Sequence, residues 1–196
     1  MEAATAPIHR SLATLTALVA KDPGNTQWLG NLADAQLQGA RLARSRKHRD
    51  AAQHLAEAAL KSLEKPLKDN PSSTLSIRVK ADIELLLGQL AEDAGNTESA
   101  AKYRQQALAC IEPIAMHAAD PRTLAVLVAA LLASGKDKDA MPHILALQRI
   151  GYRPVGFVAM LRQHGISYPA NPRFDKHIAQ LLRSNTPSPY AAATHP

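Results

Sequence analysis

The stretch LLLGQLAEDAGNTESAAKYRQQAL, residues 85–108, places small side chains where a packed helix ordinarily carries Leu or Phe. These small residues are Gly88, Ala91, Gly95, Ala100 and Ala107. Helix axes pack about 8–10 Å apart, and the shorter separations require small side chains at the contact. We therefore predict two antiparallel helices in close contact. Gly95 is expected in the turn between them, because glycine accepts a positive φ without steric cost.

The composition favours an all-α fold. Apolar residues make up 46% of the 196 residues, enough for a core, and aromatic residues only 4%. Ala, Leu, Gln, Lys, Arg and Glu are strong helix formers, and β-branched residues are sparse. Pro and Gly clusters divide the chain into segments with helical periodicity. The predicted helices are 8–21, 26–46, 50–67, 73–93, 97–117, 121–133, 137–149, 155–164 and 173–183.

Residues that cap helix N-termini stand before several of these segments. Asn25 and Asp120 are single candidates, whereas the choice is open between Ser72 and Ser73, and between Asn96 and Thr97. Short polar side chains at these positions accept hydrogen bonds from the free amides of the first turn. The caps support the predicted helix starts.

An internal repeat relates residues 50–64 to residues 98–112, which lie 48 positions later. Alignment at this offset pairs Ala52 with Ala100 and Ala59 with Ala107. A shorter third copy contains Gly135, Ala140 and Leu147. Repetition at a fixed period indicates stacked supersecondary units.

The pattern L87-G88-x2-A91-x3-G95-x4-A100-x6-A107 resembles the tetratricopeptide repeat, as does L131-x3-G135-x4-A140. That family's repeat is about 34 residues long, so the spacing here implies extended first helices. The copy at 26–67 departs most, with RKHRD in place of the turn glycine. The resemblance implies a right-handed α-solenoid in one domain, residues 1–183. Its expected parts are helix pairs at 26–67, 73–117 and 121–149, a cap at 154–183 and a flexible tail at 184–196.

A looser resemblance covers the whole chain. It rests on the order of four stretches, LVAKDPGNTQWLGNLA, ALKSLEKPL, ADPRTLAVLVAALLASGKDKDA and IGYRPVGFVAMLRQHGI. This order is similar to the C-terminal repeat region of bacterial signalling proteins that carry a Ser/Thr kinase or a winged-helix domain at the N-terminus. The sequence has no Gly-rich loop, HRD or DFG, so the kinase itself is absent. Residues 8–21 read as the second helix of a pair whose first helix is missing. We expect the chain to be a fragment, or that helix to be covered by another element.

Some candidate partner-binding residues lie on the predicted first helices, which by the resemblance form the concave side of a solenoid, and the others belong to the basic run from Arg41 to Arg49. They are Asn31, Gln38, Arg41, Arg44, Arg46, Lys47, Arg49 and Arg78, with Glu84 and Gln89 further along. A scaffold of this kind binds acidic or phosphorylated segments through Arg clusters.

The sharpest charge feature is the run from Arg41 to Arg49, with five Lys or Arg in nine residues and no acid. One interpretation is contact with phosphate or an acidic peptide, which brings strong salt dependence. The other is a solvated helix end, where cations interact favourably with the helix dipole. No aromatic residues interleave, so stacking on single strands is poorly supported.

Catalytic and metal motifs are not evident. The eight His residues lack ligand spacing. Ser62 to Lys65 spells S-x-x-K without its companion motifs, and Ser134-Gly135-Lys136 lacks the other residues of a phosphate loop. Cys110 is the only cysteine, which excludes an internal disulfide, and it is expected to be buried. We predict no catalytic residues, no metal and no cofactor.

Aromatic residues gather near the C-terminus, at Tyr152, Phe157, Tyr168 and Phe174. They suit a cap over the open face of the last repeat. The alternative is a peptide-binding edge, since aromatic side chains are enriched at interfaces.

The sequence favours a non-catalytic interaction scaffold or docking module that binds a protein or peptide, and not a membrane. The net charge of +6 makes an acidic partner or nucleic acid the alternative. An enzyme with a site assembled in three dimensions is the third hypothesis. No targeting or spanning segment is visible, so the expected location is the cytoplasm.

Overall fold

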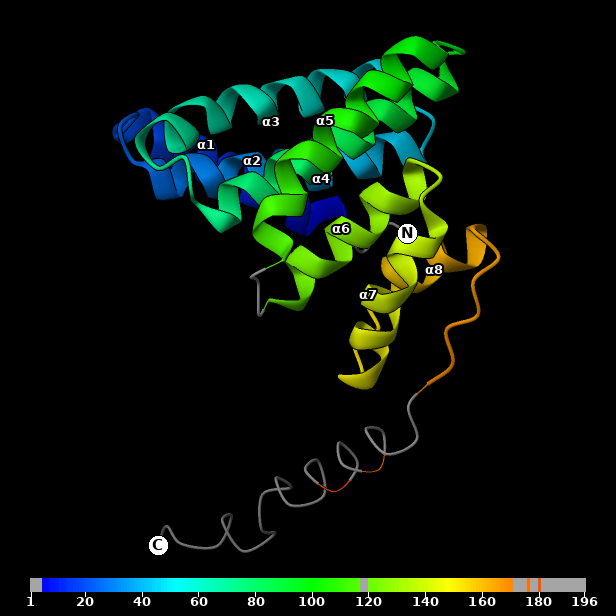
Figure 1. The fold of residues 1–196 in the computed structure, drawn as a ribbon. Coiled ribbons are helices and arrows are strands. Elements are labelled where there is room, and N and C mark those ends of the chain that lie inside the picture. The colour runs from blue at the N-terminus through cyan, green and yellow to red at the C-terminus, as the bar shows by residue number, and fades with distance from the viewer. Residues whose placement is uncertain (1–4, 117–119, 171–175, 177–179, 181–196) are drawn as a thin grey trace, which may run out of the picture. The chain divides into compact units, whose positions relative to one another are not determined.

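The computed structural model describes residues 5–116 and 120–170, together with Lys176 and Gln180. Its regular structure in this part of the chain is entirely helical (Figure 1). The helices are α1 (Thr5–Lys21), α2 (Thr26–Ser45), α3 (Arg49–Asp69), α4 (Thr74–Asp93), α5 (Thr97–Ala115), α6 (Pro121–Ala133), α7 (Asp137–Arg149) and α8 (Val155–Gln163). The all-α prediction is confirmed, as are eight of the predicted helices within a few residues at each end. Of the predicted ninth helix at 173–183 only Lys176 and Gln180 are described, and the predicted tail lies outside the described residues.

The chain divides into two compact units, residues 1–140 and 141–196, with the boundary inside α7. The first unit contains α1 to α6 and nearly all of the predicted site residues. The single domain spanning 1–183 stays a prediction, as does the cap at 154–183.

Successive helices of the first unit pack antiparallel to one another. α2 contacts α1, α3 and α4, whereas α4 contacts α2, α3, α5 and α6. α3 and α5 both contact α4 but make no sustained contact with each other. α3 and α5, the second helices of successive pairs, are therefore separated from each other, and both pack on α4.

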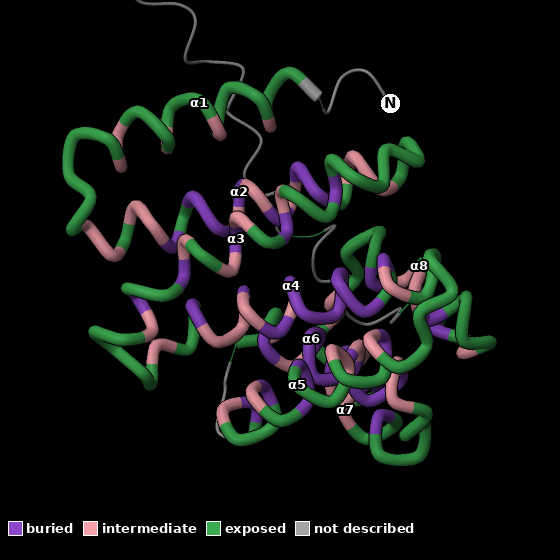
Figure 2. The backbone as a smooth tube through the Cα atoms, turned by 90° about the horizontal axis from the view of Figure 1, so that it is seen from above, coloured by how far each residue is buried: buried purple, intermediate pink, exposed green. Residues whose placement is uncertain are grey.

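One core cluster of the first unit lies between α2, α3 and α4, and Figure 2 shows further buried positions on α6. Leu37, Leu63 and Ile83 are fully buried at its centre. α1 covers one side of α2 but buries none of its described side chains; Ile8 and Leu12 are only half-buried. α1 is thus an edge helix among the described helices, and its role as the second helix of a pair stays a prediction.

The 48-residue offset found in the sequence also relates the helix pairs in the structure. α2 begins at Thr26 and α4 at Thr74, and their last residues, Ser45 and Asp93, keep the same offset. The four aligned alanines, Ala52, Ala59, Ala100 and Ala107, are all buried. The aligned positions are therefore buried in both pairs, and Ala100 lies against Gly88 of α4.

The predicted close approach of α4 and α5 is confirmed at Gly88. A Cβ atom at this glycine would lie 3.4 Å from the backbone oxygen of Ala100 and 3.5 Å from the side chain of Arg104. Ala91 is half-buried, and Gly95 lies in the turn with a φ of 76°. Small residues are needed here because the two backbones leave little room between them.

The turns between the two helices of each pair share one backbone geometry. Lys47 has a φ of 64°, Gly95 of 76° and Gly135 of 69°. In the first turn the His48 amide donates to the Ala43 carbonyl, and in the second the amide one residue after Gly95 makes the equivalent bond. This is the Schellman ending of a helix, which favours glycine at the left-handed position. Lys47 occupies this left-handed position although, unlike glycine, it has a side chain that disfavours a positive φ.

The predicted N-caps are confirmed, and the open choices are resolved. The side chains of Asn25, Ser73, Asn96 and Asp120 accept hydrogen bonds from first-turn amides of α2, α4, α5 and α6. Pro121 follows Asp120 at the first helical position, where its missing N–H has no cost.

The second unit gathers three of the four aromatic residues singled out in the sequence. The ring centroids of Tyr152 and Phe157 are 5.5 Å apart, as are those of Phe157 and Tyr168. The Tyr168 hydroxyl donates to the Tyr152 carbonyl at 2.7 Å, and the Arg153 guanidinium lies over the Tyr168 ring. Phe174 lies outside the described residues. These aromatics form a small core of their own, and their role as a cap stays a prediction.

Candidate functional site

The predicted binding residues on α2 and α4 form what we term the first-helix face: Asn31, Gln38, Arg41, Arg44 and Arg78. Asn31 and Gln38 line a cavity of about 660 Å³ between α1 and α2. The Gln38 side chain donates to the Asp34 carboxylate at 3.4 Å. The structure therefore brings Asn31 and Gln38 together in a shallow recess.

The arginines of the first-helix face are engaged within the chain. Arg41 pairs with Asp82 at 2.7 Å, and Arg44 contacts Asp93 at 2.8 Å. Arg44 also donates to Gln89 at 3.0 Å. These contacts tie α2 to α4 across the face. The sequence suggested a solvated helix end or a contact with a partner, and the structure shows a third arrangement, cross-helix ion pairing.

Arg78 is the most enclosed of the predicted arginines, with a side chain 12% exposed and 4.0 Å from the Asp120 carboxylate. On the same face, burial raises the pKa of Asp82, although the Arg41 and Arg78 guanidiniums act in the opposite direction. This face therefore presents alternating charges that largely compensate one another.

The remaining predicted residues, Arg46, Lys47 and Arg49, are exposed at the turn between α2 and α3. This turn lies at one end of the helices. The predicted residues thus separate into a recess, a set of ion pairs and an exposed turn.

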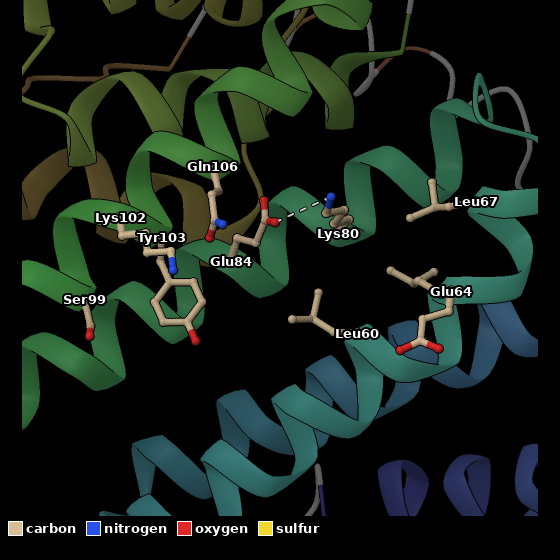
Figure 3. Close-up of a pocket in the computed structure, with 10 residues that line it drawn as sticks. Leu60, Glu64, Leu67, Lys80, Glu84, Ser99, Lys102, Tyr103 and Gln106 are labelled. Atoms are coloured by element: carbon tan, nitrogen blue, oxygen red, sulfur yellow. Dashed lines mark ion pairs between the residues drawn. The ribbon is translucent and has the colours of Figure 1, made fainter.

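A second surface lies between α3 and α5, above α4. It is a cavity of about 450 Å³, and Figure 3 shows the residues that line it. Leu60, Glu64 and Leu67 form the α3 wall, opposite Tyr103 and Gln106 of α5. The cavity exists because α3 and α5 diverge while both pack on α4. One wall is mainly aliphatic and the other mainly polar.

Glu84 of α4 lies at the base of this cavity, and its residue is only 5% exposed. The Lys80 Nζ is 3.7 Å from the Glu84 Oε1, and the Cys110 thiol donates to the Glu84 Oε2 at 3.5 Å. The first distance exceeds that of a direct hydrogen bond, and thiols are weak donors. Glu84 was expected on the exposed first-helix face, so its burial here corrects that prediction.

The titration of these groups reflects their surroundings. Burial raises the pKa of Glu84, with Lys80 opposing it. Burial raises the pKa of Cys110 to about 12, and the Glu84 carboxylate adds to this effect. Cys110 is therefore a neutral thiol near neutral pH and lacks the thiolate character of a nucleophile.

The equivalent position in the first pair carries uncharged groups. Gln36 lies 48 residues before Glu84, and Ser62 lies 48 before Cys110. The Ser62 hydroxyl donates to the Gln36 amide oxygen at 2.9 Å. The second pair thus replaces a neutral hydrogen bond with a buried carboxylate facing a cavity. The repeat alignment contains this signal, but burial of Glu84 was not evident from the helical periodicity.

A neighbouring cavity of about 500 Å³ extends the surface toward the other end of α5. It shares Leu67 and Lys80 with the first cavity and adds Ile77, Cys110 and Ile114. We term the two cavities together the α3–α4–α5 groove. Its lining follows a single stripe of α5 from residue 99 to residue 114.

No group of three or more metal-ligating side chains occurs among the residues that the structure describes. None of the described helices combines the length and apolar character needed to cross a bilayer. No protein-family model, curated protein or solved structure matches the chain.

Proposed function

We propose that the chain is a non-catalytic docking module that binds an elongated segment of another protein in the α3–α4–α5 groove. The observation that carries this proposal is the groove itself. It has an aliphatic wall, a polar wall and a buried charged group at its base. Binding sites commonly combine apolar surface with a few placed polar groups.

The dimensions of the groove favour an extended occupant over a compact small molecule. Its lining on α5 spans residues 99–114. At 1.5 Å per residue this corresponds to a length of roughly 22 Å. A helix of about four turns would lie along it, in the manner of an amphipathic helix in a hydrophobic groove.

The chemistry of the groove supports binding rather than catalysis. The pKa of Cys110 is about 12, so the thiol is not activated. The other polar groups of the groove form no nucleophile and base pair with hydrogen-bond geometry in the described residues.

The tetratricopeptide-like α-solenoid remains part of this proposal. The 48-residue offset between α2–α3 and α4–α5 supports repeated helix pairs. We also retain as a proposal the resemblance to the C-terminal repeat region of bacterial signalling proteins, in which a docking module of this kind would recruit a partner in the cytoplasm.

Nucleic-acid binding through the basic run is the second candidate. The exposed turn at Arg46, Lys47 and Arg49 favours it. Against it, Arg41 and Arg44 are already paired with carboxylates. A filter-binding assay on DNA and RNA at two salt concentrations tests this candidate. We expect no specific binding at either concentration, and tight binding with a steep salt dependence would favour the nucleic-acid function instead.

A displayed library of helical peptides tests the docking function. We expect the wild-type chain to enrich peptides whose binding is lost in Leu60→Glu and in Gln106→Trp. Leu60 is a half-buried wall residue, whereas Gln106 is exposed, so the second substitution blocks the groove with little risk to folding. Ala101→Trp is the matched control, because Ala101 is exposed on α5 and does not line the groove. Absence of enriched peptides, or binding that survives both blocking substitutions, would contradict the proposal.

A further inference from the structure

We infer that the partner of the α3–α4–α5 groove is a basic amphipathic helix that places a Lys or Arg side chain against Glu84, with apolar residues on either side. This inference rests on the docking function proposed above and names the chemistry of the segment that the groove accepts. It commits to a protein helix as occupant, because the groove is elongated and its base carries a single buried charge.

Glu84 is paired within the chain only at long distances. Buried carboxylates in proteins are ordinarily paired and hydrogen-bonded, since leaving them unpaired has a large desolvation cost. Glu84 has one cation at 3.7 Å and one thiol at 3.5 Å. The Lys80 side chain is 39% exposed, so part of its interaction is with solvent. A partner cation that reached Glu84 directly would supply the close, charge-assisted bond that is missing.

The first helix pair shows that the fold does not need this carboxylate. At the equivalent position, Gln36 and Ser62 satisfy each other with a neutral hydrogen bond. A Gln at position 84 would fill the same volume without a buried charge. A charged group occupies this position only in the second pair, α4–α5, whose outer surface lines the groove.

Two lysines, Lys80 and Lys102, balance two glutamates, Glu64 and Glu84, in the lining of the cavity, and Glu84 is the one of the four that is buried. Glu64 and Lys102 line opposite walls and are both exposed to solvent. Exposed pairs contribute little to binding because water screens them. Glu84 is desolvated, and its interaction with a partner charge is correspondingly stronger. An acidic segment would meet this carboxylate with repulsion.

The apolar residues on either side of Glu84 set the rest of the pattern. Leu60 lies in the cavity that contains Glu84, and Ile77 and Ile114 lie in the neighbouring cavity. Leu67 belongs to both. A helix that sets a basic residue at Glu84 therefore presents apolar side chains about one turn before and after it, at spacings of three or four residues.

The enriched peptides from the displayed library provide the test. We expect a Lys or Arg at one fixed position within an apolar stripe in these peptides. Glu84→Gln should weaken their binding by about tenfold or more, the usual effect of losing a hydrogen bond to a charged group. Lys80→Met should strengthen binding, because it removes the internal competitor for Glu84.

Asp82→Asn is the matched control for Glu84→Gln. It changes the net charge by the same amount, two residues away on the same helix, but Asp82 lies on the first-helix face and pairs with Arg41. We expect this variant to bind the peptides like the wild type. An equal loss in both variants would mean that net charge alone attracts the peptides, and would overturn the inference.

Two further outcomes separate the inference from the docking function. If enriched peptides lack a fixed basic residue, or bind Glu84→Gln as tightly as wild type, yet lose binding in Gln106→Trp, then the groove docks a segment of different chemistry. The inference then fails while the docking function stands. If the chain is a dimer that Gln106→Trp converts to a monomer, a second copy fills the groove and the inference is overturned.

Discussion

The two helix pairs α2–α3 and α4–α5 share a scaffold but differ at two kinds of position. The aligned alanines Ala52 and Ala100, and Ala59 and Ala107, are buried in both pairs, and the helix starts keep the same offset. The turn residue and the inner polar pair differ: Lys47 and Gln36–Ser62 in the first pair, Gly95 and Glu84–Cys110 in the second. Two pairs of buried alanines are thus kept in both helix pairs, whereas the inner polar position carries a charge only where it faces a cavity. This comparison separates what the fold requires from what binding requires.

Enlarging a repeated alanine has the largest expected effect on stability. Ala100→Leu and Ala52→Leu should each lower the free energy of unfolding by about 1–3 kcal/mol, because both alanines lie fully buried between helices. Urea denaturation measures both. Ala101→Leu is the control and should change stability by less than about 0.5 kcal/mol, since Ala101 is exposed. If Leu is tolerated equally well at the buried and the exposed alanines, the two pairs do not share a close helix contact at Ala52 and Ala100.

Substitutions at Gly88 test the same close contact between α4 and α5. Its Cβ would sit at an ordinary contact distance of 3.4 Å from the Ala100 backbone oxygen. Gly88→Ala should therefore be neutral or stabilising by up to about 1 kcal/mol, because alanine is the better helix former. Gly88→Leu should be destabilising in the same denaturation experiment. A large loss for Gly88→Ala would mean that the helices approach more closely than described.

Exchanging the turn residues Lys47 and Gly95 should have the next largest effect on stability. Lys47→Gly should raise the stability by about 1 kcal/mol, because φ at this position is 64° and only glycine adopts such values freely. Gly95→Lys should lower it by a similar amount. Thermal unfolding of the two variants and the double exchange measures the effects. If both single exchanges leave stability unchanged, the two turns do not share the left-handed geometry.

The pH dependence of Glu84→Gln should be smaller but has a definite sign. Burial raises the pKa of Glu84 above its ordinary 4.5 in the folded chain. The folded state therefore retains a proton that the unfolded state releases, and wild-type stability falls as the pH rises from 4.5 through the folded pKa. Glu84→Gln lacks this loss, so its advantage over wild type should grow from about pH 4 to pH 7. Urea denaturation at both values checks it, and a pH-independent difference would contradict it.

Thiol reactivity should show the smallest effect and compares the inner polar pairs directly. The Cys110 pKa of about 12 reflects burial first and the Glu84 carboxylate second. Glu84→Gln should accelerate alkylation of Cys110 several-fold near pH 9, because it removes the second cause. Ser62→Cys in a Cys110→Ser background places a thiol beside neutral Gln36, and it should react faster than Cys110. Equal rates in all three proteins would show that Glu84 does not act on the thiol.

The sequence predicted the helices and their N-caps because both depend on local properties of the chain. Small residues at Gly88 and Ala100 and the caps at Asn25 and Asp120 carry their structural reasons in the residue type itself. The candidate site was harder to predict from the sequence. Arg41 and Arg44 stood out as a basic run, but their carboxylate partners lie more than forty residues away on α4. Only the packing of α2 on α4 brings those charges together.

The groove could not be predicted for a related reason. It depends on how far α3 and α5 diverge, which is a property of three helices packed together and not of any one segment. Glu84 alone resembles an ordinary surface residue of a helix. The clue that the sequence does contain is its alignment with Gln36 at the repeat offset.

The most direct test of the docking site is the footprint of an enriched peptide on the isotope-labelled chain, measured by NMR cross-saturation. The α3–α4–α5 groove predicts transfer to Leu60, Leu67, Tyr103 and Gln106, with none at Asn31 or Gln38. A footprint centred on the recess between α1 and α2 would contradict this account and return the binding site to the first-helix face.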